Sequence, residues 1–175
     1  MKHKSVLFTV LFLFSSLIFA QSNHLSVGLI GTQFSNLNST DRISQIDNPF
    51  GYGVIVGYKI NQNVTVALTG EYFKGDMANS LGEEKNLRAH LSVYLMPVTL
   101  GKFSPYISTG WVYTNRNTDF TNSTSKTKNF LNGRIGLGVD YALIQNLGLN
   151  ADLGMYTDGL SLVGFSSSVG LRFAL

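Results

Sequence analysis

Two residues of the chain, His90 and Ser92, have the types and the spacing for nucleophilic chemistry. A histidine close to a serine can take the proton of the hydroxyl group, and a carboxylate such as Glu71 can orient that histidine. Hydrolysis therefore depends on the direction in which these side chains point. The sequence has no phosphate-binding loop, no zinc-ligand spacing and no EF-hand, so we expect neither a cofactor nor a metal ion.

A second set of chemistry-bearing residues consists of ionisable side chains spread over several otherwise apolar segments. Their signs nearly balance, so they could form a network of salt bridges or, alternatively, a gated path for ions or protons. The set comprises Lys59, Glu71, Arg88, His90, Arg134, Asp140, Asp152 and Arg172. Which of the two it forms depends on the elements that hold these residues.

The composition narrows the class of protein. Of the 175 residues, 44% are hydrophobic and 13% charged, with 18 Gly, 3 Pro and no Cys. Ordinary globular domains carry about 25% charged residues, so neither a disordered tail nor a charged helical domain fits. The absence of Cys excludes disulfides and thiolate metal sites. The formal charge of +3 falls to +1 without Lys2 and Lys4, since 11 basic residues then face 10 acidic ones, and we expect no nucleic-acid partner.

The first twenty residues resemble a secretory signal peptide. A short basic start at 1–4 precedes an apolar run at 6–20, which is shorter than the roughly 18 residues of a spanning helix. We expect cleavage between Ala20 and Gln21, which divides the chain into a signal peptide at 1–20 and one domain at 21–175.

Apolar and polar residues alternate with a period of two in eight segments after the signal, which predicts β-strands. In the second segment, Phe50, Tyr52 and Val54 share one face, while Gly51 and Gly53 lie on the other. The predicted strands are 24–35, 49–60, 64–75, 87–98, 105–116, 129–143, 147–157 and 164–175.

The connections alternate in length, which predicts an up-and-down meander. The longer ones are 36–48, 75–86, 116–128 and 158–163, and the shorter ones are 61–63, 99–104 and 144–146. Strand adjacency would place Asp140, Asp152 and Arg172 together toward the shorter connections. It would place Glu71 near Arg88 or His90 toward the longer ones.

The composition of the two faces indicates which one is inside. The polar face is dominated by Gly, Ser, Thr and Asn, which suits a narrow interior. The apolar face becomes aromatic near the strand ends, for example at Phe50, Trp111 and Tyr58, as is typical of side chains at membrane interfaces. Unpaired strand edges are costly in hydrocarbon. We therefore predict an all-β fold, an eight-stranded antiparallel up-and-down transmembrane β-barrel.

The last strand, 168–175, alternates up to the end of the chain, with Leu171, Phe173 and Leu175 on the apolar face. Together with the eight-strand pattern it resembles the OmpA/OmpX-type family of small outer-membrane β-barrels. That resemblance implies the outer membrane of a Gram-negative bacterium as the location, both termini in the periplasm, and outer-membrane lipid as the surroundings. It also implies that these three residues form the assembly signal read by the barrel-assembly machinery, with periplasmic chaperones as further partners. Members commonly end in Phe, whereas this chain ends in Leu175.

The expected function is a structural or adhesin-like surface-interaction role of a monomer without catalytic residues. Polar stretches at 36–40 and 118–128 would belong to four exposed loops that could bind an extracellular ligand. The alternative is a small ion or solute channel. A lipid-modifying barrel enzyme comes third: His90 and Ser92 resemble the His-x-Ser pair of outer-membrane lipid A deacylases, but the alternation points them inward, away from lipid.

Overall fold

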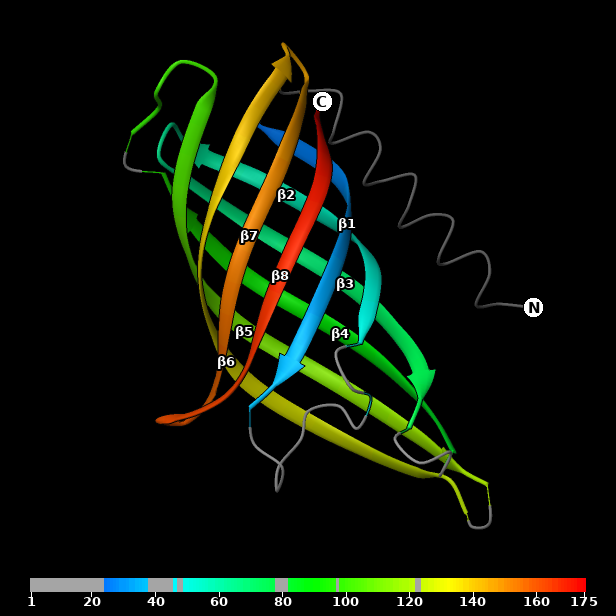
Figure 1. The fold of residues 1–175 in the computed structure, drawn as a ribbon. Helices are drawn as coiled ribbons and strands as arrows, with labels where there is room; N and C mark the ends of the chain where they lie inside the picture. Colours follow the sequence, from blue (N-terminus) through cyan, green and yellow to red (C-terminus); the bar gives the residue numbers. More distant parts are fainter. Residues whose placement is uncertain (1–23, 38–45, 47–48, 78–81, 97, 122–123) are drawn as a thin grey trace, which may run out of the picture.

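The computed structural model describes residues 24–37, 46, 49–77, 82–96, 98–121 and 124–175. It shows a closed antiparallel barrel of eight strands in chain order, as predicted (Figure 1). The strands are β1 (Leu25–Asn36), β2 (Phe50–Asn61), β3 (Val64–Asp76), β4 (Gly82–Leu95), β5 (Phe103–Phe120), β6 (Lys126–Ile144), β7 (Leu147–Asp158) and β8 (Ser161–Ala174). In the part of the chain described, no helix is long and apolar enough to cross a membrane.

The barrel closes between the first and the last strand. β1 pairs with β2 on one side and with β8 on the other, where the register runs from Ser26↔Ala174 to Asn36↔Gly164. Closure gives the backbone groups of both strands partners inside the wall, which hydrocarbon cannot supply.

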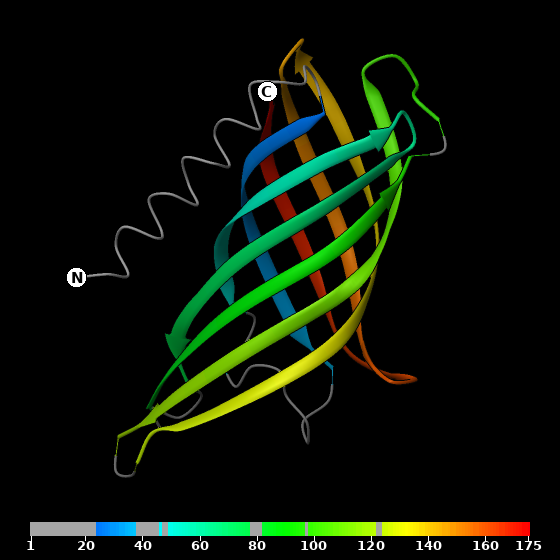
Figure 2. The ribbon, with the colours of Figure 1, turned by 180° about the vertical axis from the view of Figure 1, so that it is seen from behind.

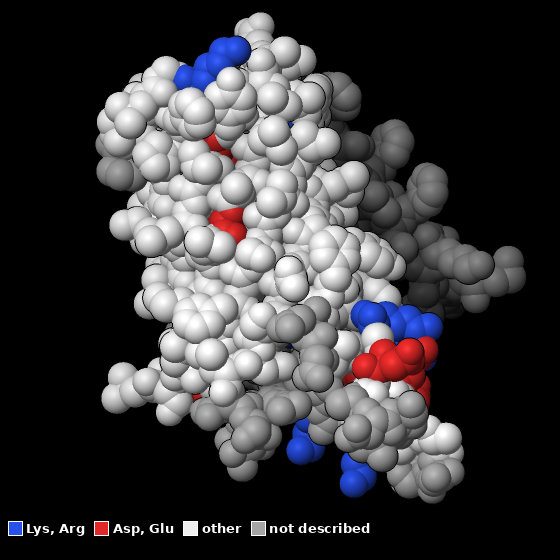
Figure 3. All heavy atoms as spheres, in the orientation of Figure 1, with Lys and Arg blue, Asp and Glu red and all other residues white. Residues whose placement is uncertain are grey.

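The two faces of the wall have the predicted polarity. Leu29 is 66% exposed on the outside, whereas the polar side chains of Thr32 and Arg88 are buried on the inside. On the face that Figure 3 shows, Lys, Arg, Asp and Glu atoms gather mainly near the two ends of the barrel, and most of the wall between them is free of charged residues. Such an apolar band suits contact with lipid.

The two ends of the barrel differ. We call the end with the connections 62–63, 96–102 and 145–146 the turn-side end, and β1 begins and β8 ends there. The opposite, loop-side end has the connections 37–49, 77–81, 121–125 and 159–160. Figure 2 shows β5 and β6 projecting farthest at this end, away from the turn between β7 and β8.

Several predicted strand ends and loops are wrong. β4 begins at Gly82 instead of residue 87, β5 continues to Phe120, and β6 begins at Lys126, so most of the predicted loop 118–128 is strand. The predicted loop 158–163 is a tight turn at 159–160, with Gly159 at φ 58°. Beyond the hydrocarbon a strand no longer needs apolar side chains, so the alternation ends before the pairing does.

Candidate functional site

The inward side chains form layers across the lumen, and they determine whether anything can pass through it. In β4 the inward positions are the even ones, so Arg88, His90 and Ser92 are all buried. Seven of the eight residues of the predicted interior set lie in these layers, and Lys59 does not.

Glu71 and His90 contact each other in the middle of the lumen. The Glu71 Oε2 atom lies 2.8 Å from His90 Nε2, and the Thr32 hydroxyl donates to Glu71 Oε1 at 2.6 Å. All three side chains are buried. This position is one of the two that the sequence suggested for Glu71.

Arg134 and Asp152 form a second buried pair. Arg134 Nη2 donates to Asp152 Oδ1, and Nη1 donates to Ser108 Oγ at 3.0 Å. Gly136 and Gly154 leave the space for the guanidinium group, because a Cβ atom on Gly154 would lie 2.5 Å from Arg134 Nη2. Asp152 is thus the partner of Arg134, not of the turn-side residues as its height in the strand suggested.

The third pair lies at the turn-side end. Arg172 Nη1 lies 3.1 Å from Asp140 Oδ2, and Asn150 Nδ2 donates to Asp140 Oδ1 at 2.8 Å. Asn150 Nδ2 also lies 2.7 Å from the Tyr106 hydroxyl, which joins this pair to an aromatic layer.

Arg88 lies between aromatic rings. It pairs in register with Glu71, but its guanidinium carbon lies 4.1 Å from the ring centroid of Phe34 and 4.4 Å from that of Phe73. Its side chain is fully buried, and among the described residues its nitrogen atoms have no hydrogen-bond acceptor. Cation–π contacts therefore take the place of a direct salt bridge.

Two apolar layers enclose the central polar side chains. Phe34, Phe73, Val112, Tyr156 and Val163 form the loop-side layer. Ile30, Ile55, Ala67, Tyr94 and Tyr106 form the turn-side layer. Between the layers the structure has a cavity of about 20 Å³, lined in part by Glu71, His90, Arg134 and Asp152. This volume holds about one water molecule.

The positions of His90 and Ser92 bear on the hydrolase interpretation. His90 is 5% exposed and Ser92 is 2% exposed, both inside the barrel, and the imidazole contacts Glu71. A substrate in the lipid would have no access to either group. A protein without catalytic residues remains our prediction, which this burial supports.

Sequence reasoning missed an additional polar layer near the loop-side end. Glu84, Asn86 and Arg116 are buried there, and Asn86 Nδ2 donates to Glu84 Oε1 at 2.6 Å. The sequence pattern places these residues in the predicted connections 75–86 and 116–128. Continuing the even-numbered inward positions of β4 back from Arg88 would have identified the first two.

The outer face of the strand extensions carries ion pairs instead of apolar residues. Lys74 Nζ and Lys85 Nζ each lie 2.8 Å from Glu83, and Lys85 Nζ lies 3.3 Å from Asp119. Hydrogen bonds from Lys74 and Lys85 lower the pKa of Glu83, and those from Ser125 and Lys85 lower the pKa of Asp119. Charges in outward positions show that the hydrocarbon ends below them.

The remaining predicted sites lie at the chain termini and the turn-side rim. Lys59 is exposed at the turn-side end and makes no ion pair among the described residues. Leu171, Phe173 and Leu175 are exposed on the outer face. The predicted cleavage site, Ala20–Gln21, lies outside the described residues. Within those residues, no three His, Asp or Glu side chains are close enough to hold a metal ion.

Comparison with known proteins gives one family. The sequence matches the "Outer membrane protein beta-barrel domain" over residues 6–173. No curated protein sequence matches the chain.

Solved structures share the fold at low sequence identity. The N-terminal barrel of Pseudomonas aeruginosa OprF is 18% identical over 89% of this chain and 100% of its own, with a TM-score of 0.65. Neisserial surface protein A is 17% identical over 86% and 97%, with a TM-score of 0.69. Ail, the attachment invasion locus protein of Yersinia pestis, is 13% identical over 89% and 100%, with a TM-score of 0.62.

Proposed function

Because the chain belongs to the outer membrane protein β-barrel domain family, we propose that it is a surface-interaction protein whose loop-side end binds an extended polypeptide. The protein is an outer-membrane β-barrel. In the proposal, the loop-side end faces the cell exterior, and the turn-side end, where β1 begins and β8 ends, faces the periplasm. The observation that carries the proposal is an unpaired strand edge at 126–132.

This edge arises because β6 is longer than its neighbour β7. β6 pairs with β5 from Lys126 onward, but its pairing with β7 begins only at Gly133↔Thr157. Within the described part of the chain, residues 126–132 therefore have a strand on one side only. Seven residues extend roughly 20 Å, enough to pair with a short peptide. An extended segment can add to such an edge through backbone hydrogen bonds.

The register identifies the groups available at the edge. The Ala142 N–H donates to Lys102 O on the β5 side, and the β5–β6 register has no bulge down to Lys126. Backbone groups alternate in direction along a strand. Thr127, Asn129 and Leu131 therefore direct their N–H and C=O groups away from β5, toward the free edge.

The hairpin is held in shape before any partner arrives. On its outer face, Asn115 Nδ2 donates to Asn129 Oδ1 at 2.7 Å, and Thr127 Oγ1 donates to Asn117 Oδ1 at 3.4 Å. On the inner face, the Arg116 guanidinium carbon lies 5.0 Å from the Phe130 ring centroid. A preformed edge loses less conformational entropy on binding than a flexible loop does.

The closed lumen favours this proposal over the channel alternative. Two apolar layers and the packed side chains between them leave a cavity of only about 20 Å³. An ion would have to pass both layers without its water shell, at high cost.

One structural relative has been solved with a ligand. Ail has been solved in complex with the heparin analogue sucrose octasulfate, and that chain is 12% identical to this one. A likeness at this identity concerns the fold, so the polypeptide partner proposed for our protein rests on the β6 edge alone.

The test uses the barrel in lipid nanodiscs and peptides selected from a random phage-displayed library. We expect selected peptides to protect the amides of Thr127, Asn129 and Leu131 from hydrogen exchange. Asn129→Pro removes an N–H that faces the free edge and should abolish binding. Asn129→Ala is the matched control, because it removes the same side chain and keeps the N–H.

Two results would contradict the proposed function. Peptides that bind Asn129→Pro as well as they bind the wild type do not use the edge. A sustained single-channel conductance of the wild-type protein in planar bilayers would instead support a channel.

A further inference from the structure

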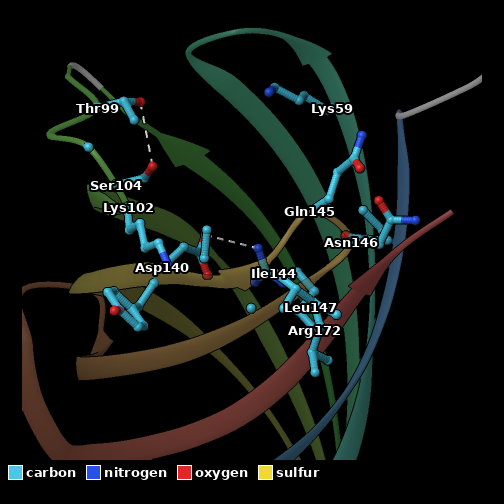
Figure 4. Close-up of a pocket in the computed structure, with 16 residues that line it drawn as sticks. Lys59, Thr99, Lys102, Ser104, Asp140, Ile144, Gln145, Asn146, Leu147 and Arg172 are labelled. Atoms are coloured by element: carbon cyan, nitrogen blue, oxygen red, sulfur yellow. Dashed lines mark hydrogen bonds and ion pairs between the residues drawn. The ribbon is translucent and has the colours of Figure 1, made fainter.

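The turn-side end of the lumen opens into a cavity of about 320 Å³ that we call the turn-side funnel. Figure 4 shows its lining, which includes Lys59 from β2, Lys102 from the connection 96–102, and Asp140 and Arg172 from β6 and β8. The strands therefore bring three cations and one carboxylate to a single concave surface.

The carboxylate is already used by other groups. Asp140 binds Arg172 through Oδ2 at 3.1 Å and Asn150 through Oδ1 at 2.8 Å. Lys59 and Lys102 make no ion pair within the described ranges. Three positive charges and one negative charge leave a net charge of +2, which belongs to the two free ammonium groups.

The shape of the funnel strengthens this charge. A concave site with walls of low dielectric constant focuses the potential of its cations. Its inner end is closed, since Asn150 also bonds to Tyr106, and the Tyr106 and Tyr94 ring centroids lie 4.9 Å apart. An anion can enter from the turn-side rim but cannot continue through the lumen.

Lys59 does not serve as an ordinary anchor on the lipid face. It follows Ile55 and Gly57 on the inward side of β2, whereas Tyr58 and Ile60 take the outward positions. Lys59 and Lys102 therefore both line the funnel, together with Ser104, whose hydroxyl donates to Thr99 Oγ1 at 3.4 Å (Figure 4).

We propose that the turn-side funnel binds a phosphate group, held by Lys59 and Lys102 and attracted by Arg172. A phosphate group with a charge of about −2 balances the net +2 and offers several acceptor oxygens to the ammonium and hydroxyl donors. The group belongs either to a soluble phosphate compound or to the head group of an anionic phospholipid at the rim. This site lies at the opposite end of the barrel from the β6 edge and does not depend on it.

The experiment follows the ¹⁵N-labelled protein by NMR in lauryldimethylamine oxide micelles, which contain no phosphate. Inorganic phosphate is titrated against sodium chloride at equal ionic strength, and the amides of Gly101 and Gly148 in the funnel lining report binding. We expect saturable shifts with phosphate and none with chloride.

A matched pair of double variants tests the site. Lys59→Gln with Lys102→Gln should weaken binding by roughly tenfold or more, because two charged hydrogen bonds are lost. Lys126→Gln with Lys128→Gln removes the same charge from the other end and should leave binding unchanged. Both pairs are exposed, and heat-modifiable migration on a gel checks that each variant is folded.

A second titration separates the two sources. Dihexanoyl-phosphatidylglycerol is added as monomers to the same micelles. Tighter binding than that of inorganic phosphate identifies a lipid head group, and weaker binding identifies a soluble phosphate compound. The proposal is overturned if neither compound shifts the funnel amides, if chloride shifts them equally, or if both double variants bind like the wild type.

Discussion

Replacing Asp152 by Asn tests whether the lumen is as closed as its packing indicates. Asp152 and Arg134 have side chains that are only 5% and 7% exposed. The substitution keeps the volume of the side chain and removes its charge. The guanidinium group then keeps the amide oxygen and the Ser108 hydroxyl as neutral hydrogen-bond acceptors but loses the carboxylate charge.

The magnitude follows from this burial. Removing one member of a buried ion pair costs about 3–5 kcal/mol, because the other charge stays away from water without compensation. Glu71 does not replace Asp152 as the partner of Arg134, because its carboxylate already contacts His90 and Thr32. With a slope of about 2 kcal/mol per molar urea, a loss of about 4 kcal/mol lowers the unfolding midpoint by about 2 M.

The assay is urea unfolding in lipid vesicles followed by the fluorescence of Trp111. It is the only tryptophan of the chain and lies on the lipid-facing side of β5, 61% exposed in the isolated barrel. The double variant Arg134→Met with Asp152→Leu removes both charges and should unfold closer to the wild type than Asp152→Asn does.

One result would refute this reasoning. If Asp152→Asn costs less than about 1 kcal/mol, the pair behaves like a pair in water. The lumen would then be hydrated, and the argument against a channel would lose its basis.

Three further predictions concern packing, lipid contact and pH. Gly154→Ala should lower the free energy of unfolding by about 1–3 kcal/mol, because the added methyl group crowds the buried Arg134 guanidinium. Gly70→Ala is the control, because its Cβ atom would meet nothing within 4 Å and should change that free energy little. Equal losses in the two variants would contradict the packing argument. Leu153 lies on the wall and is 67% exposed, so Leu153→Lys should lower the free energy of unfolding in vesicles by about 2–4 kcal/mol. Leu160 lies in the turn at 159–160 and is fully exposed, so Leu160→Lys should change that free energy very little. Similar losses in the two variants would mean that the wall does not face hydrocarbon. Lys74 and Lys85 lower the pKa of Glu83 in the folded protein below its ordinary value of 4.5. The stability that these two ion pairs contribute is therefore fully present above pH 4.5 and is lost as the pH falls through the lowered pKa of Glu83. Exchange protection factors in the β3–β4 extension should therefore fall only below pH 4.5, and a decrease near neutral pH would assign the change to other groups.

Aromatic rings inside the barrel occupy the space that glycines on neighbouring strands leave free. A Cβ atom on Gly51 would lie 2.5 Å from the Phe73 ring, and one on Gly164 would lie 2.5 Å from the Phe34 ring. These two rings in turn hold the Arg88 guanidinium group. A pattern of inward glycines could be seen in the sequence, but the rings that fill the space came from other strands.

The alternating pattern of the sequence is enough to predict the fold and the direction of the side chains. Alternation with a period of two assigns each residue to one face, so the sequence pattern places Phe50 and Val54 outside and His90 and Ser92 inside, as in the structure. Closure followed as well, because strand edges cannot remain unpaired in lipid. Both conclusions rest on local geometry and on the solvent.

Which inward groups meet cannot be predicted from the alternation, because it depends on how the strands are arranged around the lumen. Thr32 and Glu71 are 39 residues apart, and their contact depends on where the strands stand around the lumen. The pairing of Arg134 with Asp152 likewise depends on side-chain reach across two glycines. The strand ends also required the structure, because cross-strand hydrogen bonds and ion pairs, which have no periodic signature, continue β5 and β6 past the hydrocarbon.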